Sequence, residues 1–220
     1  MKKPPLIFDL DGTLVDSVYL HVAAFQEAFS KCRMQVPLYH LHRRIGMGSD
    51  RLLPSLASAL HLDLDTSSMQ AIMLAYDAAY ASLRSASAPL PGAREIWRKL
   101  HDRGIKFAIA TSAKPTDARE LAALVEYPSA APLVTGVARA SSKPAPDLFE
   151  LAASKLGVSL NEAIIVGDST WDMLASYRAR SLGVGVLTGG FSIDELSDAG
   201  AFRVYADLQE MGEKLDELGV

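Results

Sequence analysis

The sequence predicts an α/β fold: a doubly wound parallel sheet with an all-helical segment inserted after the first strand. Short runs that are apolar throughout alternate with longer segments of helical period, which is typical of a parallel sheet covered by helices on both faces. Residues 16–86, by contrast, have helical periodicity alone. The chain has 220 residues, of which 49% are hydrophobic and 22% charged, and this composition excludes a disordered or low-complexity protein.

The apolar runs are the candidate strands, and the candidate core helices lie between them. We predict strands at Leu6–Leu10, Ile105–Ala110, Ala163–Val166, Gly183–Leu187 and Arg203–Tyr205, with a weaker candidate at Pro132–Thr135. We predict core helices at Ala93–Asp102, Thr116–Val125, Ala145–Leu156 and Thr170–Arg180. Residues 1–15 and 87–220 then form the α/β core.

The segment 16–86 is too long for one crossover helix and contains no strand-like run. We predict helices in this segment at Val18–Cys32, Asp50–Leu60 and Ser67–Ser85. The exit from this segment, Ser85–Gly92, is rich in serine and proline and has the composition of a hinge. We therefore expect residues 16–86 to form a separate helical insertion.

Charge and composition exclude several classes of protein. The formal charge of −4 disfavours non-specific binding to nucleic acid or to an anionic membrane. The single cysteine, Cys32, excludes an intrachain disulfide and a zinc site built from several thiolates. No apolar run approaches the roughly 18 residues of a membrane span, and Leu6–Phe8 is too short for the core of a signal peptide. We expect a cytoplasmic monomer or homodimer.

Two carboxylates follow the apolar residues Leu6–Phe8 of the first predicted strand. Asp9 and Asp11 are two residues apart in extended chain, so their side chains leave on the same side. In open α/β sheets ligands bind at the carboxyl ends of the strands, and a divalent cation there would relieve the repulsion between buried carboxylates. Gly12 permits the positive φ of a sharp turn. The alternative is an ordinary Asp-Gly turn with Asp11 as a cap.

A second pair of acids follows the strand Ala163–Val166. Asp168 lies at the strand end and Asp172 one helical turn later, so two strand ends carry acids. Carboxylate oxygens beside a phosphate suit Mg²⁺, which we predict as the cofactor. The alternative is that Asp168 and Ser169 only cap the next helix.

Hydroxyls and lysines supply candidate phosphate ligands. Thr111 and Ser112 end the strand Ile105–Ala110, where hydroxyls and backbone N–H groups bind phosphate or simply cap a helix. Of the two Lys-Pro pairs, we favour Lys143 as the cation of the site, because prolines on its C-terminal side would hold it in place. We expect Lys114 to be a surface lysine.

The segments that contain Asp9, Thr111, Lys143 and Asp168, in this order, resemble the motifs of the haloacid dehalogenase-like superfamily of phosphotransferases. The resemblance covers the whole chain. Residues 9–16, DLDGTLVD, match its first motif, and Thr111, Lys143 and the pair Asp168–Asp172 match the other three. The helical segment looks like the small cap of the phosphoglycolate phosphatase and β-phosphoglucomutase branch. The resemblance implies a Rossmann-like core and a reaction on phosphoryl groups.

The resemblance also implies the roles of the residues. Asp9 would be the nucleophile that forms an aspartyl phosphate, and Asp11 would protonate the leaving oxygen and then activate water. Mg²⁺ would be held by Asp9, the Asp11 carbonyl and Asp168, with Asp172 close by. Thr111 and Lys143 would hold phosphoryl oxygens. Asp11 argues for phosphoryl transfer over dehalogenation, because a halide leaving group needs no proton.

The remaining predicted substrate ligands lie at the first motif, the second motif and the cap. They are Gly12, Thr13, Ser112, Arg44, Gly48 and Arg51. Arginines suit an anionic substrate; the alternative is that they are solvated residues flanking a helix.

We expect a magnesium-dependent phosphatase acting on a small phosphorylated metabolite. The alternatives are a sugar-phosphate mutase and a non-catalytic binding protein that retains the fold. A phosphonate-cleaving relative would need a cap lysine, and Lys31, the only one between Asp16 and Ser85, lies among polar residues late in the first cap helix.

Overall fold

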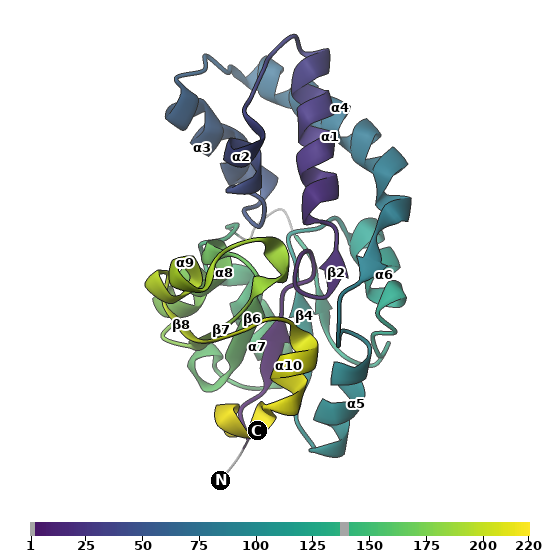
Figure 1. The fold of residues 1–220 in the computed structure, drawn as a ribbon, viewed down its shortest axis with the longest axis vertical. Coiled ribbons are helices and arrows are strands. Elements are labelled where there is room, and N and C mark those ends of the chain that lie inside the picture. The colour runs from purple at the N-terminus through teal and green to yellow at the C-terminus, as the bar shows by residue number, and fades with distance from the viewer. Residues whose placement is uncertain (1–2, 137–140) are drawn as a thin grey trace. The chain divides into compact units, whose positions relative to one another are not determined.

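The computed structural model describes residues 3–136 and 141–220. The chain forms two compact units (Figure 1). The first joins the N-terminal segment up to Asp16 with Ala88–Val220, and the second is Ser17–Ser87.

A six-stranded parallel sheet forms the centre of the first unit, as the sequence predicts. Its order is β5-β4-β1-β6-β7-β8, so β1 lies between β4 and β6. The strands are β1 (Leu6–Phe8), β4 (Phe107–Ala110), β5 (Leu133–Val134), β6 (Ile164–Gly167), β7 (Leu182–Val186) and β8 (Ala201–Tyr205). Because they are parallel, their carboxyl ends meet at one edge of the sheet.

Helices cover both faces of this sheet, which accounts for the apolar character of β1 throughout. Its alternate side chains enter two different cores: Phe8 joins a cluster with Trp97, whereas Ile7 joins one with Phe149. Trp97 packs edge-on against Phe8, with ring centroids 5.2 Å apart. The helices of this unit are α5 (Glu95–Asp102), α6 (Pro115–Leu124), α7 (Asp147–Leu156), α8 (Thr170–Arg178), α9 (Ile193–Asp198) and α10 (Leu208–Glu213).

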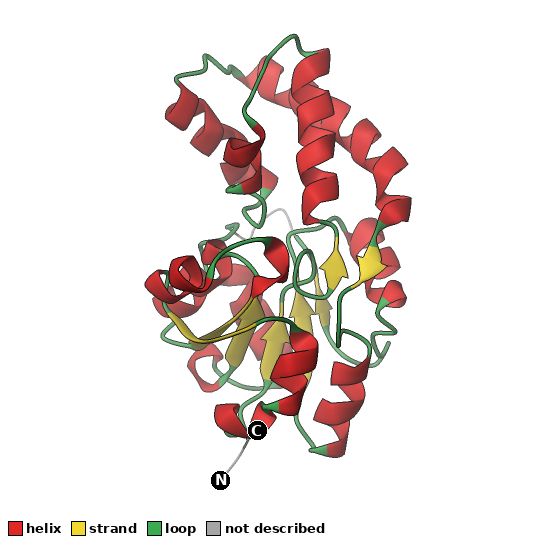
Figure 2. Cartoon of the chain, in the orientation of Figure 1, coloured by secondary structure: helices red, strands yellow, loops and turns green. Residues whose placement is uncertain are grey.

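The second unit is helical, with a core of its own (Figure 2). Its helices are α1 (Val18–Lys31), α2 (Leu38–His42), α3 (Ser49–Leu60) and α4 (Thr66–Leu83), followed by a single 3-10 turn at Arg84–Ala86. Phe25, Phe29, Leu56 and Ile72 are among the buried residues that hold these helices together. The short helix α2 was not predicted.

The expectation of no strand between the first and second sheet strands was wrong. β2 (Val15–Asp16) and β3 (Ala88–Pro89) pair antiparallel at the two ends of the helical segment. Each has only two residues, too few to produce a period of two in the sequence. The predicted hinge at Ser85–Gly92 therefore contains β3.

Within the described part of the chain, no helix combines the length and hydropathy that a membrane span needs.

Candidate active site

The ends of three neighbouring strands bring the site together. Asp9 follows β1, and its N–H donates to the Val166 carbonyl of β6 at 2.9 Å. Asp168 directly follows β6, and Thr111 directly follows β4. The parallel register therefore places residues from distant parts of the sequence at one edge of the sheet, as expected from the strand-end rule.

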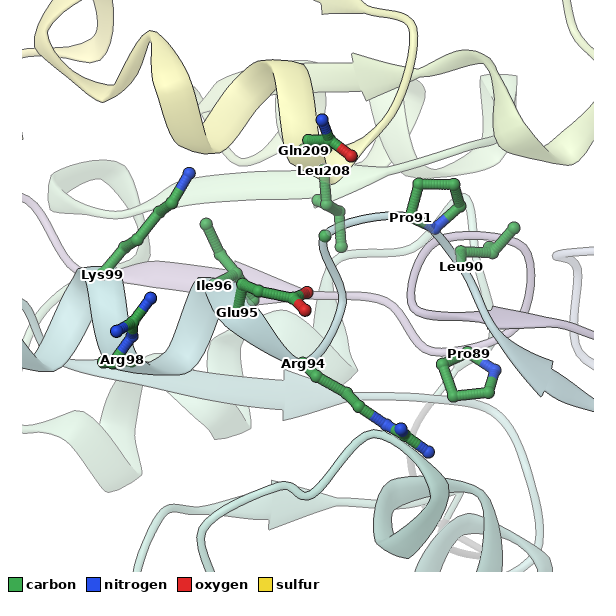
Figure 3. A pocket seen from close by; sticks show the side chains of 11 residues that line it. Pro89, Leu90, Pro91, Arg94, Glu95, Ile96, Arg98, Lys99, Leu208 and Gln209 are labelled. Atoms are coloured by element: carbon green, nitrogen blue, oxygen red, sulfur yellow. The ribbon is translucent and has the colours of Figure 1, made fainter.

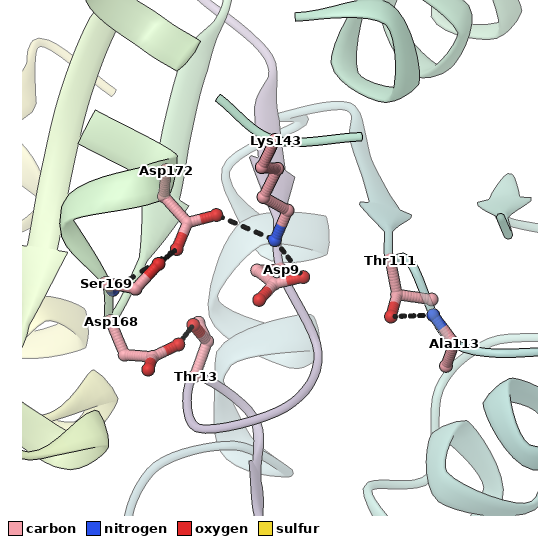
Figure 4. Close-up of polar contacts among 8 residues, drawn as sticks. All are labelled: Asp9, Thr13, Thr111, Ala113, Lys143, Asp168, Ser169 and Asp172. Carbon is pink, nitrogen blue, oxygen red and sulfur yellow. Dashed lines mark hydrogen bonds and ion pairs between the residues drawn. The ribbon is translucent and has the colours of Figure 1, made fainter. Parts of the chain in front are cut away.

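A buried ammonium lies between two carboxylates (Figure 4). Lys143 Nζ is 2.7 Å from Asp9 Oδ1 and 2.8 Å from Asp172 Oδ1. Only 1% of the Lys143 side chain is exposed, so both ion pairs are shielded from water. Burial alone would lower the pKa of Lys143, but Asp172 and Asp9 raise it above its ordinary value, so this lysine stays charged.

Asp172 is held by the helix that carries it. Its Oδ2 accepts hydrogen bonds from the Ser169 N–H at 3.2 Å and the Ser169 hydroxyl at 2.5 Å, while Oδ1 faces Lys143. A Cβ on Gly167 would lie 2.3 Å from Asp172 Cγ, so a side chain at this position would displace the carboxylate. The Ser169 cap, which was the structural alternative for this segment, is thus part of the site.

Asp168 takes its orientation from the loop after β1. Thr13 Oγ1 donates to Asp168 Oδ1 at 2.8 Å, and both residues are buried. Thr13, predicted as a substrate ligand, thus contacts a carboxylate of the site. One ligand atom from each of Asp9, Asp168 and Asp172 lies within 4.8 Å of the others, so these acids converge.

The electrostatics of this cluster oppose full ionisation. Burial raises the pKa of Asp9 to about 7, against the lowering effect of Lys143. Burial, followed by the charges of Asp172 and Asp9, raises the pKa of Asp168 well above its ordinary value. The buried carboxylates of Asp9, Asp168 and Asp172, two of which contact the Lys143 ammonium, leave an excess of negative charge when all are ionised. An oxygen donor set with that excess fits a hard divalent cation such as Mg²⁺.

The other predicted core residues lie in the segments that follow β1 and β4. Gly12 has the predicted positive φ, +80°, and its N–H closes the turn onto the Val15 carbonyl at 2.8 Å. Asp11, within that turn, is half-buried. Thr111 is buried, and its hydroxyl accepts from the Ala113 N–H at 3.1 Å, with Ser112 half-buried between them. That bond closes a local turn; the N-cap of α6 is the exposed Lys114.

The predicted cap residues have different surroundings within the second unit. Arg44 donates to Ser55 Oγ and to the His40 carbonyl, each at 3.0 Å, and so ties α2 to α3. Gly48 is the N-cap of α3, whereas Arg51 is exposed on that helix. Contact of these residues with a substrate stays a prediction.

Two residues that the sequence did not single out, Arg178 and Thr188, hold loops that carry site residues. Arg178 of α8 donates to the Pro144 carbonyl at 3.0 Å and so fixes the loop that carries Lys143. Thr188 Oγ1 donates to the Gly12 carbonyl at 2.5 Å. Residues 188–190 follow the predicted strand Gly183–Leu187, so the rule that singled out Asp9 and Asp168 could have found Thr188.

A separate hollow of about 510 Å³ lies beside the start of α5 (Figure 3). Its lining includes Pro89, Gly92, Arg94, Lys99 and Gln209, and none of the site carboxylates. A Cβ on Gly92 would lie 2.2 Å from the Gln209 nitrogen, which explains the glycine by close packing. This hollow is therefore distinct from the carboxylate cluster.

Comparison with known proteins identifies the family of this chain. Residues 6–192 match the family model of haloacid dehalogenase-like hydrolases. A phosphoglycolate phosphatase of Rhodospirillum rubrum is 31% identical, with 96% of this chain and 90% of that protein covered. A second phosphoglycolate phosphatase, from Caulobacter vibrioides, is 30% identical, with 89% and 84% covered.

Solved structures share the fold. A hydrolase from Pseudomonas syringae superposes with a TM-score of 0.93 at 37% identity, with 98% of this chain and 99% of that chain covered. A putative β-phosphoglucomutase from Bacteroides vulgatus has a TM-score of 0.87 at 19% identity, with 99% and 89% covered, and shows likeness of fold alone. With its strand-end carboxylates, its buried lysine and a family match across most of its length, this chain belongs to the haloacid dehalogenase-like hydrolases.

Proposed function

We propose that this hydrolase is a Mg²⁺-dependent phosphatase of small phosphomonoesters that works through an aspartyl phosphate on Asp9. One observation carries the proposal: Lys143 is held between Asp9 and Asp172, with Asp168 in the same buried cluster. A carboxylate nucleophile needs its charge balanced before a phosphate dianion can approach. The ammonium of Lys143 supplies part of that balance, and a bound Mg²⁺ would supply the rest.

The first half of the reaction transfers the phosphoryl group to the enzyme. A carboxylate oxygen of Asp9 attacks phosphorus, and the bond between phosphorus and the ester oxygen breaks. Asp11, two residues further along the turn, gives its proton to that oxygen, so that the alcohol leaves neutral. Lys143 holds a phosphoryl oxygen throughout and offsets the charge on Asp9.

The second half releases phosphate. Asp11, now ionised, takes a proton from a water molecule whose oxygen attacks the phosphorus of the aspartyl phosphate. The bond between phosphorus and the Asp9 oxygen breaks, and inorganic phosphate leaves. Asp11 is thereby reprotonated and Asp9 is again a carboxylate, so atoms and charges balance over the cycle.

The remaining predicted residues have binding roles in this proposal. Asp9, Asp168 and the Asp11 carbonyl would hold Mg²⁺, with Asp172 supporting from the Lys143 side. Thr111, Ser112, Gly12 and Thr13 would surround the phosphoryl group, and Arg44, Gly48 and Arg51 of the helical unit would select the rest of the substrate.

The relatives named as phosphoglycolate phosphatases favour a small acidic phosphomonoester as substrate. The experiment is a panel of phosphorylated metabolites, phosphoglycolate included, assayed by phosphate release with Mg²⁺ or with EDTA and ranked by kcat/KM. Phosphate release that requires Mg²⁺ and disappears in Asp9→Asn supports the proposal. Turnover that requires a sugar bisphosphate primer and releases no phosphate indicates the mutase alternative, and unchanged turnover in Asp9→Asn contradicts both.

A further inference from the structure

We propose that Thr188 and Gly189, which follow β7, are positioning residues for the carboxylate cluster and control its affinity for a divalent cation. This inference rests on the proposed function in that it assigns the cation to the same site. In this proposal neither residue touches the substrate or the reacting atoms. Each acts through a neighbour: Thr188 through the Asp11–Thr13 turn, and Gly189 through Asp168.

The sheet brings this segment to the site. β7 pairs parallel with β6, and Gly167 and Gly185 are partners in the register. The 3-10 turn Leu187–Gly189 therefore follows β7 at the sheet edge where Asp168 follows β6. It makes β7 a further strand whose end contributes to the site.

The Thr188 hydroxyl fixes one particular peptide group. It donates to the carbonyl of Gly12 at 2.5 Å, and this carbonyl belongs to the peptide that joins Gly12 to Thr13. Asp11 lies just before that peptide, and Thr13, which donates to Asp168 Oδ1 at 2.8 Å, lies just after it. Holding this peptide thus orients the Asp11 turn and the hydroxyl that binds Asp168.

Gly189 contacts Asp168 directly through its backbone. A Cβ added at Gly189 would lie 1.8 Å from Asp168 Oδ2 and 2.6 Å from its Cγ. Both residues are buried, and a Cβ at this distance would displace the Asp168 carboxylate. Asp168 is thus enclosed between the Thr13 hydroxyl at one oxygen and the Gly189 backbone at the other.

Such outer contacts set metal affinity by keeping the ligand oxygens in place. Loss of a group that orients a metal ligand costs about 10–100-fold in affinity. The Thr188 hydroxyl acts on Asp168 only through Thr13, so we expect its removal to lower metal affinity by an amount near the lower end of that range. A side chain at Gly189 displaces Asp168 itself, so the larger loss is expected there.

The test measures binding of Mn²⁺, a paramagnetic substitute for Mg²⁺, to the full chain stripped of metal, by the electron paramagnetic resonance of the unbound ion. Thr188→Val removes the hydroxyl at nearly constant volume, and Thr188→Ser keeps it. We expect affinity to fall about tenfold in Thr188→Val and by less than about twofold in Thr188→Ser. Gly189→Ala should lose affinity further, and Asp168→Asn, which replaces a proposed ligand, should weaken binding as well.

Matched controls separate positioning from general damage. Thr116→Val is the same exchange at an exposed position of α6, and Gly212→Ala adds a Cβ whose nearest neighbour, 3.1 Å away, is the mobile end of Lys99. Both should bind Mn²⁺ like the unaltered protein.

Wild-type Mn²⁺ affinity in Thr188→Val overturns the inference, and so does equal weakening in Thr188→Val and Thr188→Ser, since that implies a role in packing alone. Because binding is measured without substrate, failure of the phosphatase proposal, seen as unchanged turnover in Asp9→Asn, remains a separate result.

Discussion

Lys143 Nζ lies 2.7 Å from Asp9 Oδ1, and both side chains are almost fully buried. Loss of this ion pair should therefore affect the stability of the fold as well as the reaction. Removing one partner of a buried pair leaves an unbalanced charge, which costs about 3–5 kcal/mol. For Lys143 the charge left behind is that of Asp9 and Asp172 together.

Replacing Lys143 by methionine should damage stability and activity together. The metal-free Lys143→Met protein should lose about 3–5 kcal/mol of unfolding free energy in urea at pH 8. Its kcat/KM should fall by at least about 100-fold, because the charge on Asp9 is no longer offset. Mg²⁺ should stabilise this variant more than the unaltered protein.

The matched control for that substitution is Lys114→Met, which changes an exposed lysine at the start of α6. It should leave both stability and kcat/KM close to those of the unaltered protein. Equal effects of the two substitutions would contradict the role assigned to Lys143.

The stability of the metal-free protein should fall as pH rises from about 4 to about 7. Burial raises the pKa of Asp9 from 3.8 to about 7, so in this range the folded state keeps a proton that the unfolded chain releases. Each such proton contributes a slope of about 1.4 kcal/mol per pH unit. The raised pKa of Asp168 adds to the slope with the same sign.

Urea unfolding in EDTA at pH 5, 6 and 7 measures this slope. Asp9→Asn should reduce this slope by the contribution of one proton, about 1.4 kcal/mol per pH unit. Asp198→Asn, at an exposed position, should leave the slope unchanged. A slope that is the same in Asp9→Asn as in the unaltered protein would show that Asp9 is not the group that titrates.

Asp11→Asn should separate the two halves of the reaction. With p-nitrophenyl phosphate the leaving group needs no proton, so the first transfer to Asp9 still occurs, whereas the attacking water has lost its base. Rapid mixing should therefore show a burst of one p-nitrophenolate per active site, followed by slow turnover. An alkyl phosphate, whose alcohol needs a proton to leave, should release no burst of that alcohol. Bursts of equal size from the two substrates would refute the acid role of Asp11.

Arg44 and Arg51 should respond differently to alanine substitution. Arg44 ties α2 to α3 through Ser55 and His40, so Arg44→Ala should lower the melting temperature by several degrees. Arg51 is exposed, so Arg51→Ala should leave the melting temperature unchanged. If Arg51 contacts substrate, the ranking of substrates by kcat/KM should change; an unchanged ranking would remove it from the specificity residues.

The sequence predicts the parts of this protein that repeat a simple pattern. Apolar runs locate the six sheet strands, and the strand-end rule singles out Asp9 and Asp168, which the structure brings together. The first strand was predicted to extend to Leu10 but ends at Phe8. The difference is physical: Gly12 turns the chain at φ +80°, and Leu10 turns inward as a core residue beyond the ladder.

Other features leave no such pattern. The pair β2–β3 has two residues a side, and α9 and α10 have six residues each, so their periodicity is too short to detect. Their caps, Ser192 and Asp207, were the available signal. The bond from Thr188 to the Gly12 carbonyl joins positions far apart in the sequence, and only the sheet order makes them neighbours.

The identity of the nucleophile is the most direct test of the proposed function. Asp11→Asn protein mixed with p-nitrophenyl phosphate and Mg²⁺ should be quenched in acid, digested, and its peptides weighed by mass spectrometry. The expected result is one added phosphoryl group on the peptide that contains Asp9, absent when Asp9→Asn is introduced as well. A phosphoryl group on any other residue, or undiminished turnover of Asp9→Asn alone, would contradict the account.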